Sequence, residues 1–331
     1  MLKRIIIWLP KCDQGGGEQM SNKKNVIIIS SVAVSIIAAI VVIVLVFFVF
    51  KEDSYRIIKI FEVDGSGNVS REEIGDLEPY DNMLLESGDV ISLYEGNMTL
   101  KLDEDKYVYV EPETEFELIA KGDDVNSKTT INLHEGSIAN EIQNKLSDDS
   151  YYEINTPNST MAVRGTIYYV ATYVDENGVR YTKVSVFDGA VDTDLVKNGI
   201  KTGDNKLIQR GKEIIIYDDG IETDYLSEPT DIDFSGFSDE MLNYLIGMID
   251  SGSDVEHADE IISEKAERDE YALHGDEIHT VTFMYNGSEF GHTSVQYGKT
   301  VDEPSLVPSQ TGGWDFDFST QIKEDIVINW K

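Results

Sequence analysis

The chain has 331 residues, with 62 acidic and 27 basic side chains, and its formal net charge at pH 7 is −35. A field of this sign repels phosphate backbones, and the sequence after residue 25 has no basic stripe, which excludes nucleic acid as a partner. The single cysteine, Cys12, lies near the start, so no disulfide can form in the rest of the chain. The acidity favours a solvated exterior surface, with specific divalent-cation binding or a cationic partner as the alternatives.

The 25 residues from Val26 to Phe50 contain no charge and no proline. As a helix this run would be about 37 Å long, which exceeds the hydrocarbon core of roughly 30 Å in a bilayer. A cleaved signal peptide is the closest alternative, but its apolar part is usually about 7–15 residues long and ends at small residues. Here the run ends in aromatic residues followed by the charged Lys51–Asp53. We therefore predict an uncleaved transmembrane helix over residues 26–50.

Charges beside this run predict its orientation. Residues 1–25 carry a net charge of +3 and the chain carries −35, so the part after residue 50 carries −38. The positive-inside rule then predicts a short basic cytoplasmic tail, residues 1–25, and an extracellular remainder. The predicted location is the cell membrane, with a single pass through the bilayer. Met20 is followed by Ser-Asn-Lys-Lys and would serve as a start as well as Met1, and this alternative stays open.

Residues 55–223 alternate between strand and turn signals. Thr99–Leu102 and Tyr107–Val110 flank a polar loop, and 166–174 and 179–187 flank Asp-Glu-Asn-Gly, so each pair predicts a hairpin. Glycines next to acidic residues predict turns that need positive φ. Ile138, Ile142 and Leu146 share a spacing of four, which predicts one short helix. The expected domain is otherwise an all-β roll, sandwich or solenoid-like fold.

The remaining sequence predicts two further parts. Residues 227–276 are acidic with helical apolar spacing, and Ser238 is placed as an N-cap, so we expect a helical connector packed loosely on the β-domain. Residues 279–331 return to strand signals around an Asn286-Gly287 turn and predict a small β module. The predicted fold class is therefore mainly β.

Residues 62–73 imitate the spacing of an EF-hand calcium loop. Acidic, hydroxyl and amide side chains occupy the ligand positions of such a loop, and Gly67 occupies the position where the loop requires glycine. However, the flanking sequence alternates as strands do, so a plain Asp-Gly-Ser-Gly turn between two strands is the favoured interpretation. The residues of the alternative calcium site are Glu62, Asp64, Ser66, Asn68 and Glu73.

No catalytic constellation is present in the sequence. The five histidines lack metal-ligand spacing, and no serine stands in a strand-turn-helix glycine context. In so acidic a chain, any one pair of carboxylates carries little information. We therefore expect no enzymatic activity and no cofactor, apart from the calcium alternative above.

The most specific string is Thr156–Thr166. Pro157 and Asn158 predict a turn, Met161 and Val163 alternate into a core, and Gly165 permits a close backbone approach. Arg164 beside this glycine would hold a bend by bonding locally, or would make a signalling contact. The family motif considered below comprises Thr156, Pro157, Val163, Arg164, Gly165 and Thr166.

This motif resembles the FecR domain over roughly residues 55–220, together with Glu86–Val90, Leu100–Asp103, Glu111–Thr114 and Leu133–Gly136. The resemblance implies an all-β extracytoplasmic domain, and in the best-known members this domain relays an outer-surface signal through one membrane helix to a cytoplasmic sigma factor. Those members have a helical sigma-binding domain of many tens of residues before the membrane helix. Only 25 residues precede Val26 here, so we expect the exterior half of that function alone.

Residues 279–330 resemble the internalin-type B repeat, also called the Listeria-Bacteroides repeat. The resemblance rests on Thr280–Phe283, Val295–Lys299, Glu303-Pro304, Trp314–Phe318 and Ile328–Trp330, although the stretch between Pro304 and Trp314 is short for this family. Such repeats are small β-grasp-like modules on bacterial surface proteins. An anchor followed by these two modules resembles a surface protein of a Gram-positive bacterium.

These observations predict a single-pass bacterial surface protein whose extracellular FecR-like domain binds a ligand or partner. The expected partners are the membrane itself and an unknown extracellular protein or cell-wall polymer. Two alternatives stay open: a transmembrane regulator that acts on a cytoplasmic partner, and a calcium-stabilised adhesin or spacer.

Overall fold

The structure is a computed structural model that describes residues 56–331 apart from 124–125, 164 and 219–224. The chain divides into two units, Met1–Ser54 and Tyr55–Lys331, and every described residue belongs to the second. The predicted membrane helix at 26–50 therefore lies outside the described residues. Among the helices that are described, none is both long and apolar enough to cross a bilayer.

The described part of the chain is mainly β, as predicted. We call residues 56–237 the β-domain and residues 279–331 the C-terminal module, with two helices in between. The elements before the C-terminal module are β1 (Ile58–Arg71), β2 (Gly75–Leu77), β3 (Asp89–Leu102), β4 (Lys106–Val110), β5 (Thr114–Lys121), β6 (Lys128–Ile142), β7 (Tyr151–Thr156), β8 (Ser159–Val163), β9 (Ile167–Val174), β10 (Arg180–Asp188), β11 (Ala190–Lys197), β12 (Ile200–Gln209), β13 (Lys212–Asp218), β14 (Tyr225–Leu226), β15 (Thr230–Asp231), η1 (Phe234–Gly236), α2 (Asp239–Ser251) and α3 (Ala258–His274).

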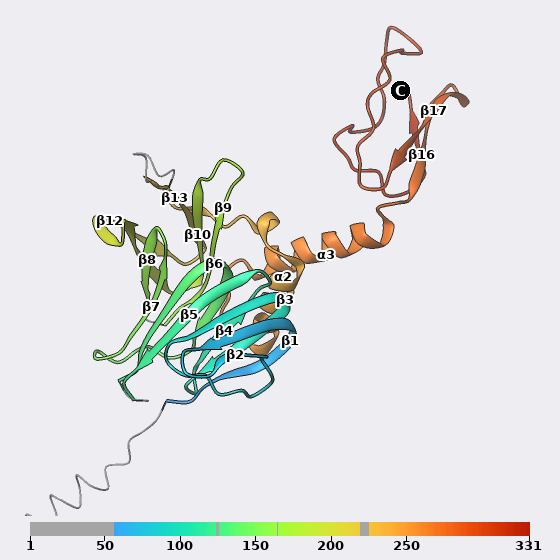
Figure 1. The fold of residues 1–331 in the computed structure, drawn as a ribbon. Helices are drawn as coiled ribbons and strands as arrows, with labels where there is room; N and C mark the ends of the chain where they lie inside the picture. The colour runs from blue at the N-terminus through green and yellow to red at the C-terminus, as the bar shows by residue number, and fades with distance from the viewer. Residues whose placement is uncertain (1–55, 124–125, 164, 219–224) are drawn as a thin grey trace, which may run out of the picture. The chain divides into compact units, whose positions relative to one another are not determined.

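The strands of the β-domain form one hydrogen-bonded network. Its longest path runs β12-β11-β8-β7-β6-β4-β3-β1-β2, and β5, β9, β10, β13, β14 and β15 pair beside this path. Figure 1 shows β1, β3, β4 and β6 next to one another. Both predicted hairpins are confirmed, since β3 pairs antiparallel with β4 and β9 pairs antiparallel with β10.

Two long strands change partners at a glycine. β3 pairs with β5 before Gly96 and with β4 after it, and β6 changes from β5 to β4 and β9 around Gly136. Both glycines have the predicted positive φ, 81° and 89°. The prediction of turns between strands was wrong for these two, because the positive φ bends a continuous strand instead. Gly65 of β1 lies opposite Gly96, and a Cβ on Gly96 would lie 1.8 Å from the Asp64 carbonyl oxygen.

The predicted short helix at Ile138–Leu146 was wrong, because residues 128–142 form β6. A spacing of four is also a multiple of two, so Ile138 and Ile142 share one face of a strand just as they would share one face of a helix. Both belong to the main apolar core, while the intervening Ala139 belongs to a second core on the other face. The burial of side chains on both faces therefore stabilises the strand and not the helix.

The two cores lie on opposite faces of the same strands. The first core contains Val108 and Val110 of β4, whereas Tyr109 of that strand belongs to the second core. The same division holds in β9, where Tyr168 and Val170 face the first core and Tyr169 faces the second. The second core is completed by apolar residues of η1, α2 and α3.

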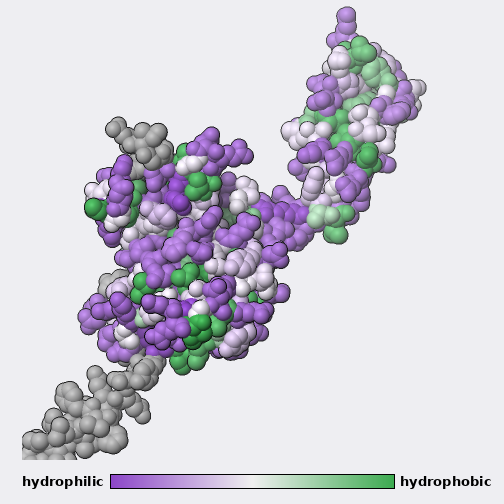
Figure 2. Space-filling view, viewed as in Figure 1, coloured by the Kyte–Doolittle hydropathy of each residue, from purple (hydrophilic) through white to green (hydrophobic). Residues whose placement is uncertain are grey.

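The helices expected between the two β regions are confirmed, but loose packing is wrong for α2. Its residues Met241, Leu242, Leu245 and Met248 are all buried in the second core, because they recur on one face of the helix. In contrast, α3 buries only Ile261. Figure 2 shows mainly hydrophilic side chains along α3, as its acidic sequence requires.

The C-terminal module has its own sheet and core. Its strands are β16 (Ile278–Tyr285), β17 (Ser288–Gln296) and β18 (Ile326–Asn329), in the order β17-β16-β18, with β18 parallel to β16. The predicted Asn286-Gly287 turn joins β16 to β17. The six buried core residues of the module are Val281, Phe283, Val295, Val301, Ile322 and Ile328.

Candidate functional site

A buried carboxylate attaches α2 to the β-domain. Glu111 follows β4 and is only 5% exposed. Its Oε2 accepts hydrogen bonds from Ser137 Oγ at 2.6 Å and Tyr169 OH at 3.1 Å, and its Oε1 accepts one from Ser238 Oγ. Ser238 in turn caps α2 by accepting the Met241 N–H at 2.9 Å. Because three hydroxyl groups satisfy this buried charge, the start of α2 is fixed against β4, β6 and β9.

An aromatic stack continues this attachment along the helix. Tyr244 of α2 lies over Tyr109 of β4, with ring centroids 4.3 Å apart and planes 16° apart. Tyr109 is buried, and this burial together with Glu111 and Glu240 raises its pKa to about 12. Burial, with a contribution from Glu141, also raises the pKa of Tyr244. Both phenols are therefore neutral at physiological pH, and the half-buried Tyr244 is the more accessible of the two rings.

A groove of about 580 Å³ opens beside this stack, between α2 and strands β1, β3, β4 and β6. Phe61 and Tyr107 add a second aromatic pair, with centroids 6.4 Å apart in an edge-to-face arrangement. No basic side chain is among the described residues that line the groove. The lining includes three carboxylates from three separate elements, Glu62, Glu141 and Glu240.

Two lysines next to the groove lie over its aromatic rings. Lys59 Nζ lies 5.4 Å from the centroid of Phe61, and Lys101 Nζ lies 5.8 Å from that of Tyr107. These distances are within the range of cation–π attraction. The groove thus combines ring faces that attract cations with carboxylates that neutralise them, and this chemistry suits a positively charged ligand.

The residues of the alternative calcium site are not gathered around one point. Glu62, Asp64, Ser66 and Asn68 all lie in β1, which runs through the Asp-Gly-Ser-Gly segment without a turn while paired with β3. A strand advances by about 3.3 Å per residue, whereas calcium ligands lie about 2.5 Å from the ion. Asn68 Nδ2 donates to Asp76 Oδ1 at 3.1 Å, and Glu73 follows the end of the strand. The turn favoured for this segment was therefore wrong, because the segment is a continuous strand, and the calcium alternative stays a prediction.

The described residues contain no group of three or more His, Cys, Asp or Glu side chains placed to hold a metal ion. Of the predicted calcium ligands, only Glu62 lines the groove beside α2. The structure therefore gives Glu62 a different environment from the one that the sequence suggested.

The first part of the family motif, residues 156–163, lies in the buried hairpin of β7 and β8. Pro157 and Asn158 make the predicted turn between β7 and β8, and Val163 is buried in the first core. Thr156 Oγ1 lies 2.7 Å from Ser159 Oγ, and Thr182 Oγ1 donates to Asn158 Oδ1 at 2.6 Å. These hydroxyl and amide groups satisfy one another inside the domain, which indicates a structural role.

The end of this motif also packs against neighbouring backbone. Gly165 has a positive φ of 100°, and a Cβ there would lie 3.3 Å from Lys145 Cα, so the predicted close backbone approach is confirmed. Thr166 Oγ1 donates to the Ala190 carbonyl oxygen at 3.2 Å. Arg164, for which we predicted either a structural or a signalling contact, lies outside the described residues. The motif and the groove share none of their residues.

Sequence reasoning missed the aromatic residues of the groove. Tyr107 and Tyr109 alternate with Val108 and Val110, so both faces of β4 carry large apolar side chains. Such a strand is expected to be covered on both faces, and this signal could have indicated a helix over the tyrosines. The partner, Tyr244, could not be inferred because it is distant in the chain.

Comparisons with known proteins support one of the two resemblances. No curated protein matches the chain. Two crystal structures of candidate anti-sigma factors from Parabacteroides distasonis ATCC 8503 align with it at 12% and 11% identity, each with a TM-score of 0.36. The alignments cover 62% of this chain and 84% of the first, and 73% of this chain and 98% of the second. The B-repeat resemblance at residues 279–330 stays a prediction. The family model described as FecR protein matches residues 90–192, and this match confirms the FecR resemblance for that part of the chain.

Proposed function

We propose that the protein is a single-pass bacterial surface protein whose FecR domain binds a cationic segment of an extracellular partner in the groove beside α2. The apolar run at 26–50 supports the membrane anchor, and the FecR match at 90–192 supports an extracytoplasmic domain with a role in signalling. The observation that carries the ligand chemistry is the convergence of aromatic side chains and glutamates in one groove, with no basic side chain among its described lining residues.

The groove selects for cations by two effects. An arginine guanidinium or lysine ammonium is attracted to aromatic faces, with an energy of about 0.5–2 kcal/mol depending on desolvation. The same group pairs with carboxylates, and arginine does so in a planar, bidentate geometry. Glu62 and Glu240 are exposed, and Glu141 is half-buried, so all three are accessible to such a side chain. An anionic ligand would meet repulsion from all three carboxylates.

Binding is best tested with a defined probe. We suggest acetyl-tetra-arginine amide carrying a fluorescent label, titrated against the full-length protein in detergent at 150 mM salt. The matched control peptide replaces each arginine by citrulline, which keeps the shape of the side chain and removes its charge. We expect the arginine peptide to bind and the citrulline peptide to bind about tenfold more weakly.

A pair of triple variants distinguishes the groove from the general acidity of the chain. Glu62→Gln, Glu141→Gln and Glu240→Gln together should weaken binding about fivefold. Glu72→Gln, Glu78→Gln and Glu176→Gln change the net charge equally at exposed sites that do not line the groove. Since the Debye length is about 8 Å at this salt concentration, the second set should leave binding nearly unchanged. Equal losses in both triple variants would refute the groove as the binding site.

A second function, transmission of the binding event to a cytoplasmic partner, is favoured by the FecR match itself. It is tested by replacing residues 1–19 or the whole tail, 1–25, with an unrelated basic sequence of equal charge. Loss of a transcriptional response with surface expression intact would support this function. An unchanged response to the ligand would leave the exterior binding function alone.

A further inference from the structure

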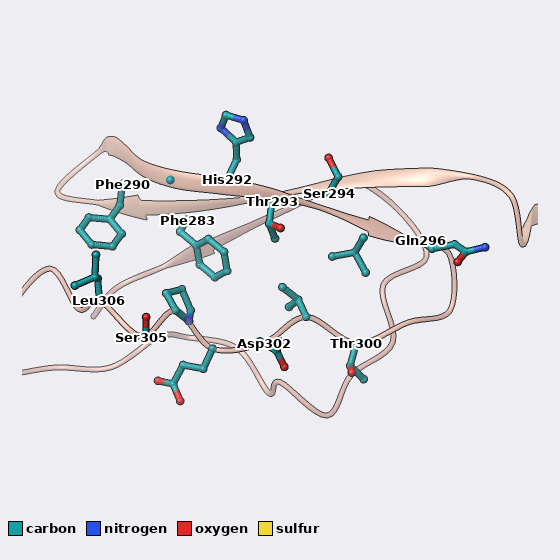
Figure 3. A pocket seen from close by; sticks show the side chains of 15 residues that line it. Phe283, Phe290, His292, Thr293, Ser294, Gln296, Thr300, Asp302, Ser305 and Leu306 are labelled. Atoms are coloured by element: carbon teal, nitrogen blue, oxygen red, sulfur yellow. The ribbon is translucent and has the colours of Figure 1, made fainter.

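A second groove lies in the C-terminal module, between β17 and the segment 300–306, and has a volume of about 620 Å³. Figure 3 shows the side chains of Phe283, Phe290 and Leu306 together at one end and Thr293 turned toward the groove. Phe283 is buried, but Phe290 is 41% exposed and Leu306 is 75% exposed. The groove therefore has an apolar end that the module itself does not cover.

One wall of this groove is an unpaired strand edge. Within the described sheet β17-β16-β18, β17 has a neighbour on one side only. The Tyr297 N–H donates to the Glu277 carbonyl oxygen at 2.8 Å, so these two residues form a hydrogen-bonded pair. Every second pair along the antiparallel ladder of β16 and β17 is hydrogen-bonded in the same way. Because backbone groups alternate in direction along such a ladder, the peptide groups of His292, Ser294 and Gln296 point away from β16.

The edge also lacks two common protections against pairing, although a bulge interrupts its register with β16 near Gly291. Exposed edge strands are commonly blocked by lysine, by proline or by a covering segment. Ser288–Gln296 contains neither lysine nor proline. The backbone groups of His292 and Ser294 and the N–H of Gln296 therefore lie open to another extended backbone, whereas the Gln296 carbonyl oxygen accepts the Lys299 N–H at 3.0 Å.

The opposite wall has free backbone groups as well. Among the described residues, segment 300–306 makes no backbone–backbone hydrogen bond. This segment has no regular secondary structure, and its apolar Val301 is anchored in the core of the module. The groove is therefore bordered on both sides by backbone that has no partner of its own. An added strand would find donors and acceptors on the β17 side and further polar groups on the other.

Charge indicates which kind of strand fits. Asp302 and Glu303 line the groove, and no lysine or arginine is among its described lining residues. Neither carboxylate has a cationic partner within the described part of the chain. A basic side chain on the incoming strand would supply that partner, while an apolar side chain two residues away would lie on the same face of the strand, toward Phe290 and Leu306.

We propose that the C-terminal module binds an extended peptide segment of a partner protein as an added strand on β17. The segment carries an apolar residue for the Phe283–Phe290–Leu306 end of the groove and a basic residue, at an alternate position, for Asp302 and Glu303. This mode of recognition takes its affinity from backbone hydrogen bonds and its specificity from alternate side chains. The site is separate from the groove beside α2 and does not depend on the function proposed for that groove.

The test uses the full-length protein in detergent and the peptide acetyl-Thr-Leu-Thr-Lys-Thr-Val-Thr-amide. Its alternating leucine, lysine and valine lie on one face of a strand. Two control peptides have the same length: one carries glutamate in place of lysine, and the other is N-methylated at alternate amides so that it cannot complete the ladder. Binding is followed by hydrogen exchange of β17 and by the fluorescence of Trp314, which packs against Phe283 and Phe290.

We expect the peptide to slow exchange at His292, Ser294 and Gln296 by about tenfold, and both control peptides to leave these amides unchanged. The double variant Asp302→Asn, Glu303→Gln should weaken binding about threefold. Asp276→Asn with Glu324→Gln is the matched control, because it removes equal charge from exposed positions outside the groove. This control should bind like the unmodified protein.

Three outcomes would overturn the proposal. Equal binding of the N-methylated and unmodified peptides would exclude strand addition, and equal loss in the two double variants would exclude a specific role for Asp302 and Glu303. Protection of the same amides that grows with protein concentration, in the absence of peptide, would assign the edge to a second copy of this chain instead.

Discussion

The β-domain and the C-terminal module contain the same kind of strand pairing but differ in how much of it they complete by themselves. The β-domain buries apolar residues on both faces of β4, β6 and β9, and α2 closes its second core. The module has a single core of six buried residues and leaves β17 with one free edge. In the larger domain, the groove beside α2 therefore offers a ligand side chains, although the end strands β12 and β2 each have one neighbour only. In the smaller one, backbone itself is available for binding.

The largest loss of stability in the β-domain is expected from Gly96→Ala. A Cβ at this position would lie 1.8 Å from a backbone oxygen of the facing strand, so β1 and β3 would have to separate. We expect a loss of about 4 kcal/mol in the free energy of unfolding of the β-domain. The measurement is thermal unfolding of the full-length protein followed by far-UV circular dichroism.

Gly178→Ala is the matched control for this variant. Gly178 has the same φ of 81°, but a Cβ there would have nothing within 4 Å. It should therefore cost only about 1 kcal/mol, the strain of the backbone conformation alone. If the two variants unfolded at the same temperature, the close approach of β1 and β3 would not be a determinant of stability.

The second prediction compares the two cores directly. Leu100 is fully buried in the first core of the β-domain, and Leu100→Ala should cost about 3 kcal/mol. Ile328→Ala in the module should cost a similar amount locally, but only the module should respond. Two of the three tryptophans, Trp314 and Trp330, pack against each other there, so with Trp8→Phe in the background tryptophan fluorescence reports the module, while circular dichroism is dominated by the larger domain.

Independent responses would show that the two regions unfold separately. A shift of both signals in either variant would instead mean that they form one cooperative unit. In that case the free edge of β17 would belong to a structure that the β-domain stabilises, and the module would not be an independent unit.

The third prediction concerns alkaline pH. Burial raises the pKa of Tyr109 to about 12, and burial also raises the pKa values of Tyr152, Tyr168 and Tyr169. A tyrosine with a raised pKa in the folded state contributes stability that is fully present below its unfolded value of about 10 and is lost as pH rises toward the folded value. Each such tyrosine should therefore cost about 1 kcal/mol per pH unit above pH 10.

The module carries one tyrosine with a raised pKa, Tyr297, whose hydroxyl donates to Glu270. With increasing pH, the β-domain should consequently lose stability more steeply than the module. The two can be followed by circular dichroism and tryptophan fluorescence in denaturant titrations at successive pH values. A parallel decline of both would indicate that the buried tyrosines of the β-domain are not the cause.

Local sequence signals predicted much of the fold but little of the groove. Ser238 and the apolar spacing after it identified α2 within one residue of its start, because a cap and a helical face are encoded within a few residues. The Ile138–Leu146 helix failed because a spacing of four fits a strand as well as a helix. The Tyr109–Tyr244 stack joins residues far apart in the chain, so it depends on the packing of α2, which no local pattern contains.

The smallest expected effect is that of calcium, and it follows from the same kind of non-local packing. Strand pairing with β3 overrides the loop-like sequence of residues 62–71 and holds Glu62, Asp64 and Ser66 along a strand. A specific ion that bound only the folded state would raise the unfolding midpoint by mass action. Because these oxygens do not converge, we expect millimolar calcium to change the free energy of unfolding by less than about 0.5 kcal/mol, equally in the unmodified protein and in Glu62→Gln with Asp64→Asn. A rise of several degrees that this double variant abolishes, measured against a chelator control, would instead require β1 to leave β3 and close around the ion.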